Sequence, residues 1–290
     1  MPKEPAQSLL FIVIILLVGG VIAWAGSQGG ALVGGVPVFA LCAAISFGLN
    51  GLFFIPAYAY QTEHYFDLAG SITYWVLLIT SLTLSPHIDK RDLLIGGMIA
   101  LWATRLGTFL FIRIRRDGSD GRFDRLKTRA PRFLMVWVLQ GLWVLLTAAC
   151  GLAAINSAAK APLGIMAATG ASLWLIGMAI EITADQQKKR FRLRPENEGR
   201  FITTGIWAWS QHPNYFGEIL LWAGIALVAL PNLFGWQLLT LISPLFVFIL
   251  LTRISGIPLL KARGQKRWGR EDDYQDYIQR TPVLVPRPPR

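Results

Sequence analysis

The nine residues SQHPNYFGE, from Ser210 to Glu218, place several side chains able to do chemistry beside a long apolar run. Asn214 carries a hydrogen-bond donor and an acceptor, and the carboxylate of Glu218 accepts. Because Pro213 lacks an N–H and suits the first turn of a helix, a helix is predicted to start there. Asn214 and Glu218 then lie one turn apart on one face. Such a face could hold a carboxamide group, or the two residues could simply cap the helix.

A charged run, EITADQQKKRFRLRPENEGRF, precedes this stretch. Glu181, Asp185, Lys188 and Arg192 are spaced by four, three and four residues, which predicts one helical face. The simpler interpretation is a charged helix end with internal ion pairs. Two features favour a binding role: the run ends a membrane helix, and it leads within about 20 residues to the first motif.

Two further groups could take part. Arg105 lies well inside an apolar run, where an arginine is costly and faces the protein interior or a watery cavity; the alternative is snorkelling. In AYQTEHYFDLAGS, Glu63 and Asp67 are four residues apart, with Tyr65 between them. We expect like charges on one helical face to keep one of these carboxyls partly protonated. The alternative is a solvated acidic loop, and the residues leave open which carboxyl is the acid.

A fourth group lies near the end of the chain. Tyr274, Tyr277 and Arg280 are spaced by three, which predicts one helix face that either caps a nucleotide pocket or ties the tail to the basic loops. The Pro-rich end that follows, residues 281–290, is expected to be a loose tail.

These groups must be positioned by membrane helices. The chain is 53% hydrophobic and only 16% charged, with a mean hydropathy of +0.46. Runs of about 18 or more uncharged residues span a bilayer as helices. One apolar block, 92–112, carries Asp92 and Arg105, and the blocks without charge are 8–26, 32–59, 68–86, 134–159, 161–180 and 219–252. The last block contains Pro231-Asn232 and Gly235, so it is predicted to form two helices. The expected fold is an all-α polytopic bundle of seven to eight transmembrane helices, a single domain over residues 1–290.

The first block could also be a signal peptide, since Ala23-Trp24-Ala25 is similar to a cleavage site. Its long apolar run favours a retained helix.

The net charge of +11 has a topological explanation. Of 28 Lys and Arg, 8 lie in 113–132, 6 in 188–200 and 9 in 253–290, and alternation of eight helices puts these segments on one side. The positive-inside rule makes that side cytoplasmic, with anionic lipids as partners and no nucleic acid. Cys42 and Cys150 sit inside apolar blocks, and the sequence contains no His/Cys metal cluster, dinucleotide fingerprint or P-loop.

Taken together, HPNYFGE, the preceding KKRFR and GRFITTGIW, and a tail of the form WG…Y-x-x-Y-x-x-R-T-P-x-L-x-P resemble the steroid 5-alpha-reductase-like membrane proteins. The chain is more closely similar to the bacterial branch of that group. The similarity covers roughly residues 55–290 and is strongest in 185–285. A related group, the isoprenylcysteine and phospholipid methyltransferases, shares an R-H-P-x-Y-like turn and a similar tail.

The resemblance implies helices open to the cytoplasm that hold NADPH, in the bacterial inner membrane. It implies an oxidoreductase of the 3-oxo-5-alpha-steroid 4-dehydrogenase type, which reduces an activated C=C bond in a steroid-like or other lipophilic substrate of lipid metabolism. We expect a monomer. By motif position, the candidate cofactor contacts are Asp185, Lys189, Arg192, Arg200, Asn214 and Glu218, with Arg105 from the fourth helix. The wider candidate set adds Arg113, Arg116, Gly205, His212, Tyr215, Tyr274, Tyr277 and Arg280.

The resemblance also implies an acid and a tyrosine that grip a substrate carbonyl. Asp67 is the nearest match for the acid, with Glu63 and Tyr65 close by. The position nearest the tyrosine is Trp102, whose indole donates a hydrogen bond but keeps its proton. This departure argues against a steroid substrate of the usual kind.

Two other functions compete with the reductase. An S-adenosylmethionine-dependent membrane methyltransferase usually carries Arg before the His-Pro pair, where this chain has Gln211. A non-catalytic lipid-binding or transport protein would tend to show repeats and helices broken at the bilayer midplane. Here the polar residues crowd one side of the membrane instead.

Overall fold

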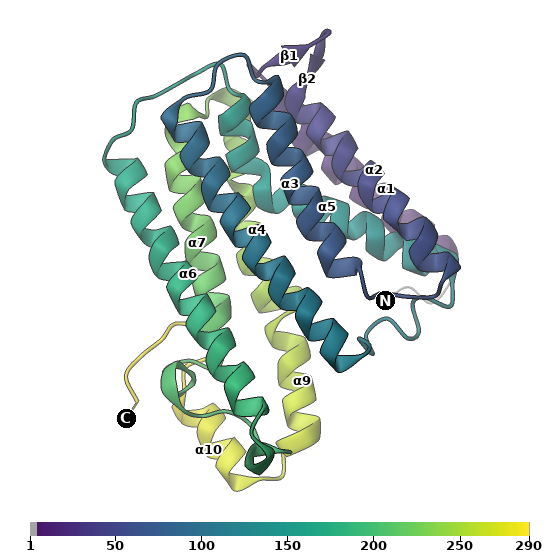
Figure 1. The fold of residues 1–290 in the computed structure, drawn as a ribbon, viewed down its shortest axis with the longest axis vertical. Coiled ribbons are helices and arrows are strands. Elements are labelled where there is room, and N and C mark those ends of the chain that lie inside the picture. Colours follow the sequence, from purple (N-terminus) through teal and green to yellow (C-terminus); the bar gives the residue numbers. More distant parts are fainter. Residues whose placement is uncertain (1–4, 290) are drawn as a thin grey trace. The chain divides into compact units, whose positions relative to one another are not determined.

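The computed structural model describes residues 5–289, and these fold almost entirely as helices (Figure 1). The α-helices are α1 (Pro5–Ser27), α2 (Val38–Ala59), α3 (Phe66–Leu84), α4 (Lys90–Asp117), α5 (Ala130–Asn156), α6 (Ile165–Arg192), α7 (Pro213–Ala229), α8 (Ile242–Ile249), α9 (Ile257–Trp268) and α10 (Asp272–Arg280). Eight helical stretches within the described residues are long and apolar enough to span a membrane. The predicted all-α polytopic fold is confirmed, and the chain is a multi-pass membrane protein.

The apolar blocks predicted the helices well but not all of their ends. Residues 32–37, expected to open a helix, instead form a small hairpin of β1 (Leu32–Val33) and β2 (Val36–Pro37). Its turn residues Gly34 and Gly35 both have positive φ, which glycine adopts without strain. The last block divides between Pro231 and Gly235 as predicted.

The span after Gly235 changes helix type several times, which the sequence did not predict. It begins as a 3₁₀ helix over Gly235–Leu241, continues as α8 and ends in a π-turn over Leu250–Ile254. The helix breaks at Ser255 and Gly256 before α9.

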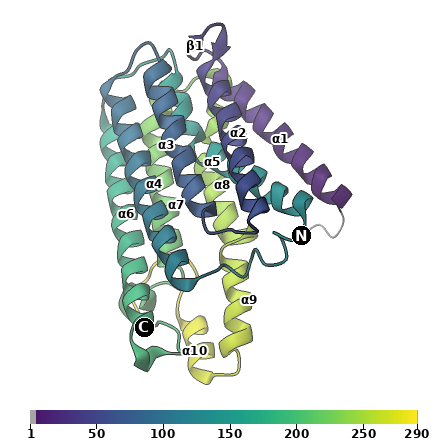
Figure 2. The ribbon, with the colours of Figure 1, turned by 45° about the vertical axis from the view of Figure 1, so that its right-hand side comes forward.

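The chain forms two compact units. Unit 1 comprises the residues up to Ala167 together with Ala226–Ser243, and unit 2 comprises Ala168–Ile225 and the residues from Pro244 on. In unit 1, helices α1 to α4 all pack against α5 (Figure 2). Nearly every side chain of α5 from Val144 to Asn156 is buried, so this helix forms the core of the unit.

In unit 2, α6 and α7 approach each other closely because glycines line their contact. A Cβ atom at Gly217 would lie 2.6 Å from the carbonyl oxygen of Gly177, and one at Gly224 would lie 2.5 Å from that of Gly170. Small residues of this kind let membrane helices pack backbone to backbone. The start of α7 is therefore held firmly beside the end of α6.

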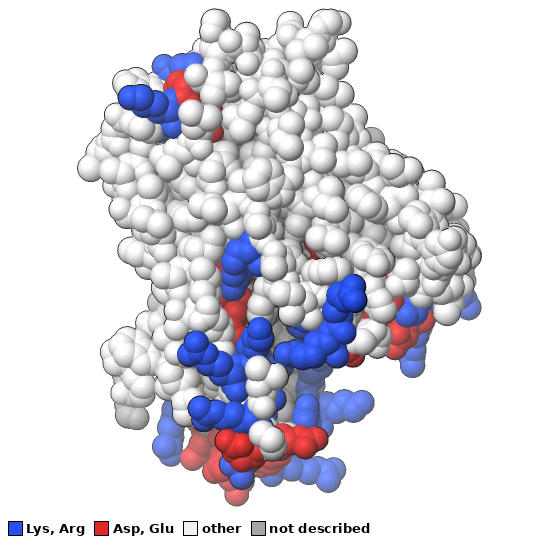
Figure 3. Space-filling model, viewed as in Figure 1, with Lys and Arg blue, Asp and Glu red and all other residues white. Residues whose placement is uncertain are grey.

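Charged side chains gather toward helix ends, and most of the helix flanks carry none (Figure 3). In unit 1 the last turn of α4 carries Arg115 and Arg116, and in unit 2 the last turn of α6 carries Lys189, Arg190 and Arg192. This distribution is typical of helices that cross a bilayer.

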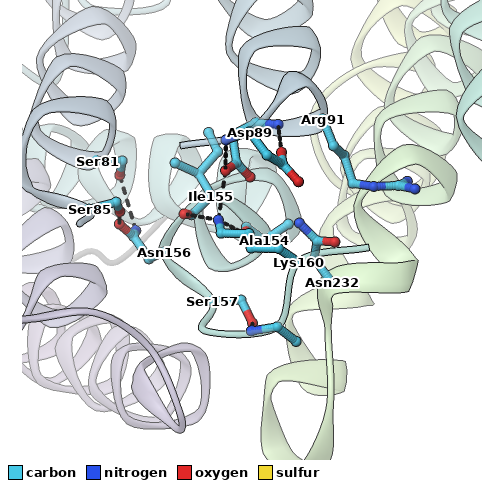
Figure 4. A network of polar contacts seen from close by, with 12 residues as sticks. Ser81, Ser85, Asp89, Arg91, Ala154, Ile155, Asn156, Ser157, Lys160 and Asn232 are labelled. Carbon is cyan, nitrogen blue, oxygen red and sulfur yellow. Dashed lines mark hydrogen bonds and ion pairs between the residues drawn. The ribbon is translucent and has the colours of Figure 1, made fainter. Parts of the chain in front are cut away.

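In unit 1, a buried polar network lies where α3 and α5 end and α4 begins (Figure 4). Asp89 and Asp92 form a capping box at the start of α4, and Lys160 Nζ lies 2.6 Å from Asp92 Oδ2. Asn156 donates to Ser81 Oγ and accepts from Ser85 Oγ at the end of α3. The network fixes the loops that connect these helices.

Arg91 lies beside this network, in the first turn of α4. It is 2% exposed and donates to the carbonyl oxygens of Ala161, Pro162 and Val228 at 3.2, 2.6 and 2.6 Å. Without the Arg91 side chain, each of these three carbonyls would lose this hydrogen-bond donor, which is costly for a buried group.

We expect Arg91→Ala to lower the free energy of unfolding by about 2 to 3 kcal/mol, because three buried carbonyls lose their donor. Arg91→Lys, which keeps the charge and part of the hydrogen bonding, should fall between alanine and wild type. Thermal unfolding can be followed with a thiol-reactive dye, since Cys42 and Cys150 are both buried. An Arg91→Ala variant as stable as wild type would show that these hydrogen bonds contribute nothing.

Candidate functional site

The start of α7 lies against the charged end of α6 in unit 2. Pro213 is the first residue of α7, as predicted. Asn214, in the first turn, donates from Nδ2 to Asp185 Oδ1 at 3.4 Å. The two motifs that the sequence placed about 20 residues apart thus meet through these side chains.

The face of α6 beside α7 is acidic and buried. Glu181 is 2% exposed and Asp185 is 8% exposed, one turn apart on α6. The next turn carries Lys188, whose Nζ lies 4.4 Å from the centre of the Trp207 ring. The predicted helical face from Glu181 to Arg192 is confirmed, since α6 runs to Arg192 without a break.

The segment that follows folds back over the end of α6. Gly205 has φ +65°, and a Cβ atom there would lie 2.3 Å from Gln187 Oε1, so glycine is required. The same oxygen accepts the N–H of Ile206 at 3.0 Å, and Trp207 Nε1 donates to Ala184 O at 3.0 Å. Gly205 therefore shapes the turn that brings the chain to α7.

His212 is buried just before α7 and stacks on Tyr215, with ring centres 5.5 Å apart and planes at 12°. Burial and the nearby charge of Lys188 lower the pKa of His212 to about 4. The imidazole is therefore neutral at pH 7, and its Nδ1 has no hydrogen-bond partner within the described residues. His212 is a support or a neutral contact rather than a proton carrier.

The C-terminal segment ties this region together. Gln211 Nε2 donates to Ile278 O and Thr281 O, and Ser210 Oγ donates to Leu284 O. The N–H of Arg287 donates to Trp209 O at 3.0 Å. The N–H of Gln211 also donates to Pro282 O. The tail, which was expected to be loose, is thus hydrogen-bonded to the segment before α7 from Pro282 to Arg287.

The tyrosines of α10 lie in an aromatic cluster with Phe201 and Trp268. Tyr277 donates its hydroxyl to Trp207 O at 2.8 Å, and burial raises its pKa above the ordinary value. The hydroxyl of Tyr274 lies over Gly264. Arg280 pairs with Asp276 at 3.2 Å. Tyr277 thus ties α10 to the segment before α7, and it also lines an open cavity together with Arg200 and Arg280, so both roles considered for this face stay open.

The donors of unit 2 fit a nicotinamide nucleotide by their chemistry. Asp185, Asn214 and Glu218 offer acceptors and a donor that suit a carboxamide. Lys189 and Arg192 lie exposed in the last turn of α6. Arg200 lines an open cavity of about 690 Å³, which Arg280 and the carboxylates Glu271, Asp273 and Asp276 also line. Cations of this kind bind phosphate groups.

In unit 1, Asp67 lies in the first turn of α3 and faces α4. Its Oδ2 is 3.6 Å from Arg113 Nη2, and both side chains are partly exposed. A Cβ atom at Gly107 would collide with Ser71, so α3 and α4 pack closely next to this pair. The structure thus pairs Arg113, a candidate cofactor residue, with the candidate acid.

Deeper along the same two helices, Trp102 is 2% exposed and meets Tyr74 edge to face, with ring centres 5.3 Å apart. The sequence analysis missed Tyr74. Its position seven residues after Asp67 puts the two on one face of α3, and that spacing is the signal that could have found it. Trp102 stands at the motif position nearest the tyrosine, and the phenol of Tyr74 therefore lies next to that position.

Three other candidates lie near these helices. Arg105 stacks over Phe109 at 5.5 Å, and Tyr65 directly precedes α3 with 54% of its surface exposed. Arg116 pairs with Asp117 at 2.8 Å on the surface.

Glu63 does not share a helical face with Asp67, and that expectation is wrong because α3 begins only at Phe66. Glu63 is buried in the preceding loop, where it accepts the N–H of Asp120 at 3.0 Å and lies 2.8 Å from Lys127 Nζ. Burial alone would raise the pKa of Glu63, but these hydrogen bonds and the charge of Lys127 outweigh burial, so the pKa lies below its ordinary value. Glu63 is therefore an ionised latch between two loops.

The latch makes stability depend on pH. The pKa of Glu63 is lower in the folded than in the unfolded protein, so its contribution is complete above about pH 5 and is lost as the pH falls through the folded pKa. We expect the unfolding temperature of wild type to drop more steeply between about pH 5 and pH 3 than that of Glu63→Gln. Parallel pH profiles of the two proteins would contradict this account.

Comparison with known proteins places these observations in context. The family model described as "Protein of unknown function (DUF1295)" matches residues 53–281. The chain is 30% identical over 118 residues to 3-oxo-5-alpha-steroid 4-dehydrogenase 1 of Rattus norvegicus, covering 41% of this chain and 40% of that protein. The protein of the same name from Mus musculus is also 30% identical over 118 residues, 41% of each chain. The chain thus spans about two fifths of the length of these relatives.

A longer match is to an uncharacterized protein of Schizosaccharomyces pombe. It is 24% identical over 220 residues, covering 62% of this chain and 64% of that protein. No solved structure matches the chain.

Proposed function

Because the chain belongs to the DUF1295 family, which is related to the steroid 5-alpha-reductases, we propose that it is a membrane-embedded NADPH-dependent reductase of an activated C=C bond in a lipophilic substrate. The observation that supports the proposal is the hydrogen bond from Asn214 to Asp185, which joins the two candidate cofactor motifs close to the basic end of α6.

Unit 2 would hold the cofactor. Asn214, Asp185 and Glu218 would orient the nicotinamide carboxamide, and Lys189, Arg192 and Arg200 would bind phosphates. The extra 2′-phosphate of NADPH is the group for which such a cationic cluster is best suited. His212, buried and neutral, would support the motif without exchanging a proton.

Unit 1 would hold the substrate carbonyl. Asp67, fixed by Arg113, would polarise the carbonyl of an enone, and a second donor would come from the Trp102 and Tyr74 pair. NADPH, when bound, would supply a hydride for the β-carbon of the enone, and the α-carbon would take a proton from the solvent to complete the reduction. A lipophilic substrate would enter from the membrane.

The orientation follows from the charge pattern. We propose that the basic helix ends face the cytoplasm of a bacterial inner membrane and that the protein acts as a monomer. An eight-helix chain then has both termini on the cytoplasmic side.

The proposal is tested by purifying the protein in nanodiscs and identifying the nucleotide that co-purifies by mass spectrometry. The same sample is then given NADPH and a panel of lipophilic enones while nicotinamide absorbance is followed. The proposal requires bound NADPH or its oxidised form, and enone-dependent NADPH oxidation. If S-adenosylmethionine co-purifies and no nicotinamide nucleotide does, the reductase proposal is wrong and the methyltransferase alternative is favoured.

A further inference from the structure

Unit 1 contains an apolar cavity of about 430 Å³ between α2 and α3, with α5 behind them. α2 and α3 run side by side (Figure 2). Phe53, Pro56 and Ala57 of α2 line one wall, and these positions share one helical face. The cavity volume lies within the range of small-molecule sites.

The opposite wall comes from one face of α3, through Leu68, Ala69 and Ile72. The space exists because Ala57 and Ala69 have small side chains, while Trp137 of α5 closes the floor. Trp137 is held rigidly, with ring centres 5.0 Å from Phe66 and 6.0 Å from Phe133.

The cavity lies on the other side of α3 from Asp67. At about 100° per residue, Asp67 is turned by about 150° from the middle of the face formed by Leu68, Ala69 and Ile72. Asp67 accordingly pairs with Arg113 of α4, whereas the cavity is walled by α2, α3 and α5. The cavity is therefore separate from Asp67, although Tyr65, one of the residues that the sequence places beside the acid, lines its loop end.

The chemistry of the lining restricts the ligand. No lining residue is charged, and the hydroxyls of Tyr60, Thr62 and Tyr65 lie at the loop end of the cavity. Trp137 adds an indole N–H that is buried without a hydrogen-bond partner among the described residues. Tyr60 and Tyr65 are 81% and 54% exposed, and Ile72, further along the membrane helix, is 39% exposed. Tyrosines at a helix end are typical of the membrane–water interface. The mouth is thus open along the flank of the spanning helices.

We propose that this cavity binds a neutral membrane lipid, with its apolar chain or ring inside and a single hydroxyl or carbonyl head beside Tyr60, Thr62 and Tyr65. A charged head group would find no counter-ion among the lining residues. Because Asp67 faces α4 and does not line the cavity, the proposal does not depend on the reaction proposed for Asp67.

The test uses photoactivatable probes in nanodiscs: a diazirine-bearing fatty alcohol and the fatty acid of equal length. The alcohol should label peptides covering residues 53–72 at least several-fold more than the acid does. Ala69→Trp, which fills the cavity, and Ile72→Trp, which closes its mouth, should each lower this labelling at least fivefold.

Ile79→Trp is the matched control, because Ile79 is 54% exposed on α3 but does not line the cavity. Its labelling should equal that of wild type. NADPH affinity, measured on the same proteins, should be unchanged in all three variants. If Ala69→Trp does not fold, Ile72→Trp decides. Equal labelling of Ile72→Trp and Ile79→Trp, or equal labelling by alcohol and acid, would overturn the proposal.

Discussion

Alanine at Asn214 is expected to lower the affinity for NADPH by about 10- to 100-fold while leaving the fold intact. The substitution removes a hydrogen bond to the carboxylate of Asp185. A hydrogen bond to a charged group contributes about 1.5 to 3 kcal/mol, and each 1.4 kcal/mol changes the affinity about tenfold. Glu218→Ala should have a similar effect, because Glu218 lies one turn along the same face of α7. The measurements are cofactor affinity by calorimetry and the unfolding temperature.

Gln211→Ala is the control within the same motif. Gln211 donates to the carbonyls of Ile278 and Thr281, so its loss should loosen the tail and lower stability without a large change in NADPH affinity. If Asn214 and Glu218 only cap α7, their alanine variants would instead lose about 1 kcal/mol of stability and keep full affinity. That pattern would mean that the motif is structural.

Alanine at Asp67 is expected to lower kcat by about 10²- to 10⁴-fold, the usual contribution of a positioned acid, with NADPH affinity changed less than about threefold. Since Asp67 and Arg113 are both partly exposed, the stability cost should be small. Asp67→Glu, which restores a carboxyl at slightly greater reach, should recover part of the rate.

Glu63→Gln is the matched control for Asp67. Both residues are carboxylates near the start of α3, but Glu63 is bonded to Asp120 and Lys127 in a loop latch. Its variant should lose stability and keep kcat within about threefold, the reverse of Asp67→Ala. Equal loss of kcat in both variants would remove the distinction between acid and latch.

Much of the fold could be predicted because the bilayer demands long apolar runs. The eight spans, the start of α7 at Pro213 and the continuation of α6 to Arg192 all follow from local rules of hydrophobicity, proline geometry and helical spacing. The resemblance to steroid 5-alpha-reductases is likewise confirmed by the family match and the relatives.

The site was less predictable because its details depend on tertiary contacts. Glu63 was placed on a helix by its spacing from Asp67, yet it lies in the loop before α3, and Lys127, 64 positions away, pairs with it. The tail was expected to be loose from its prolines, but backbone N–H and C=O groups near Trp209 hold it. Neither the Lys127 contact nor the tail contacts leave a periodic signal in the sequence.

Tyr74 shows a third limit. Its phenol becomes relevant only because α4 brings Trp102 against it, 28 positions along the chain. The predicted roles of Asp67, Trp102 and the cationic cluster of α6 stay predictions until nucleotide and substrate binding are measured.

The central claim is that this membrane protein binds NADPH as its redox cofactor, and calorimetric titration of the purified protein with NADPH, NADH and S-adenosylmethionine tests it most directly. We predict that NADPH binds at least about tenfold more tightly than NADH, because Lys189, Arg192 and Arg200 offer cations to the additional phosphate. We predict no saturable heat from S-adenosylmethionine. Saturable binding of S-adenosylmethionine without binding of NADPH would contradict the account.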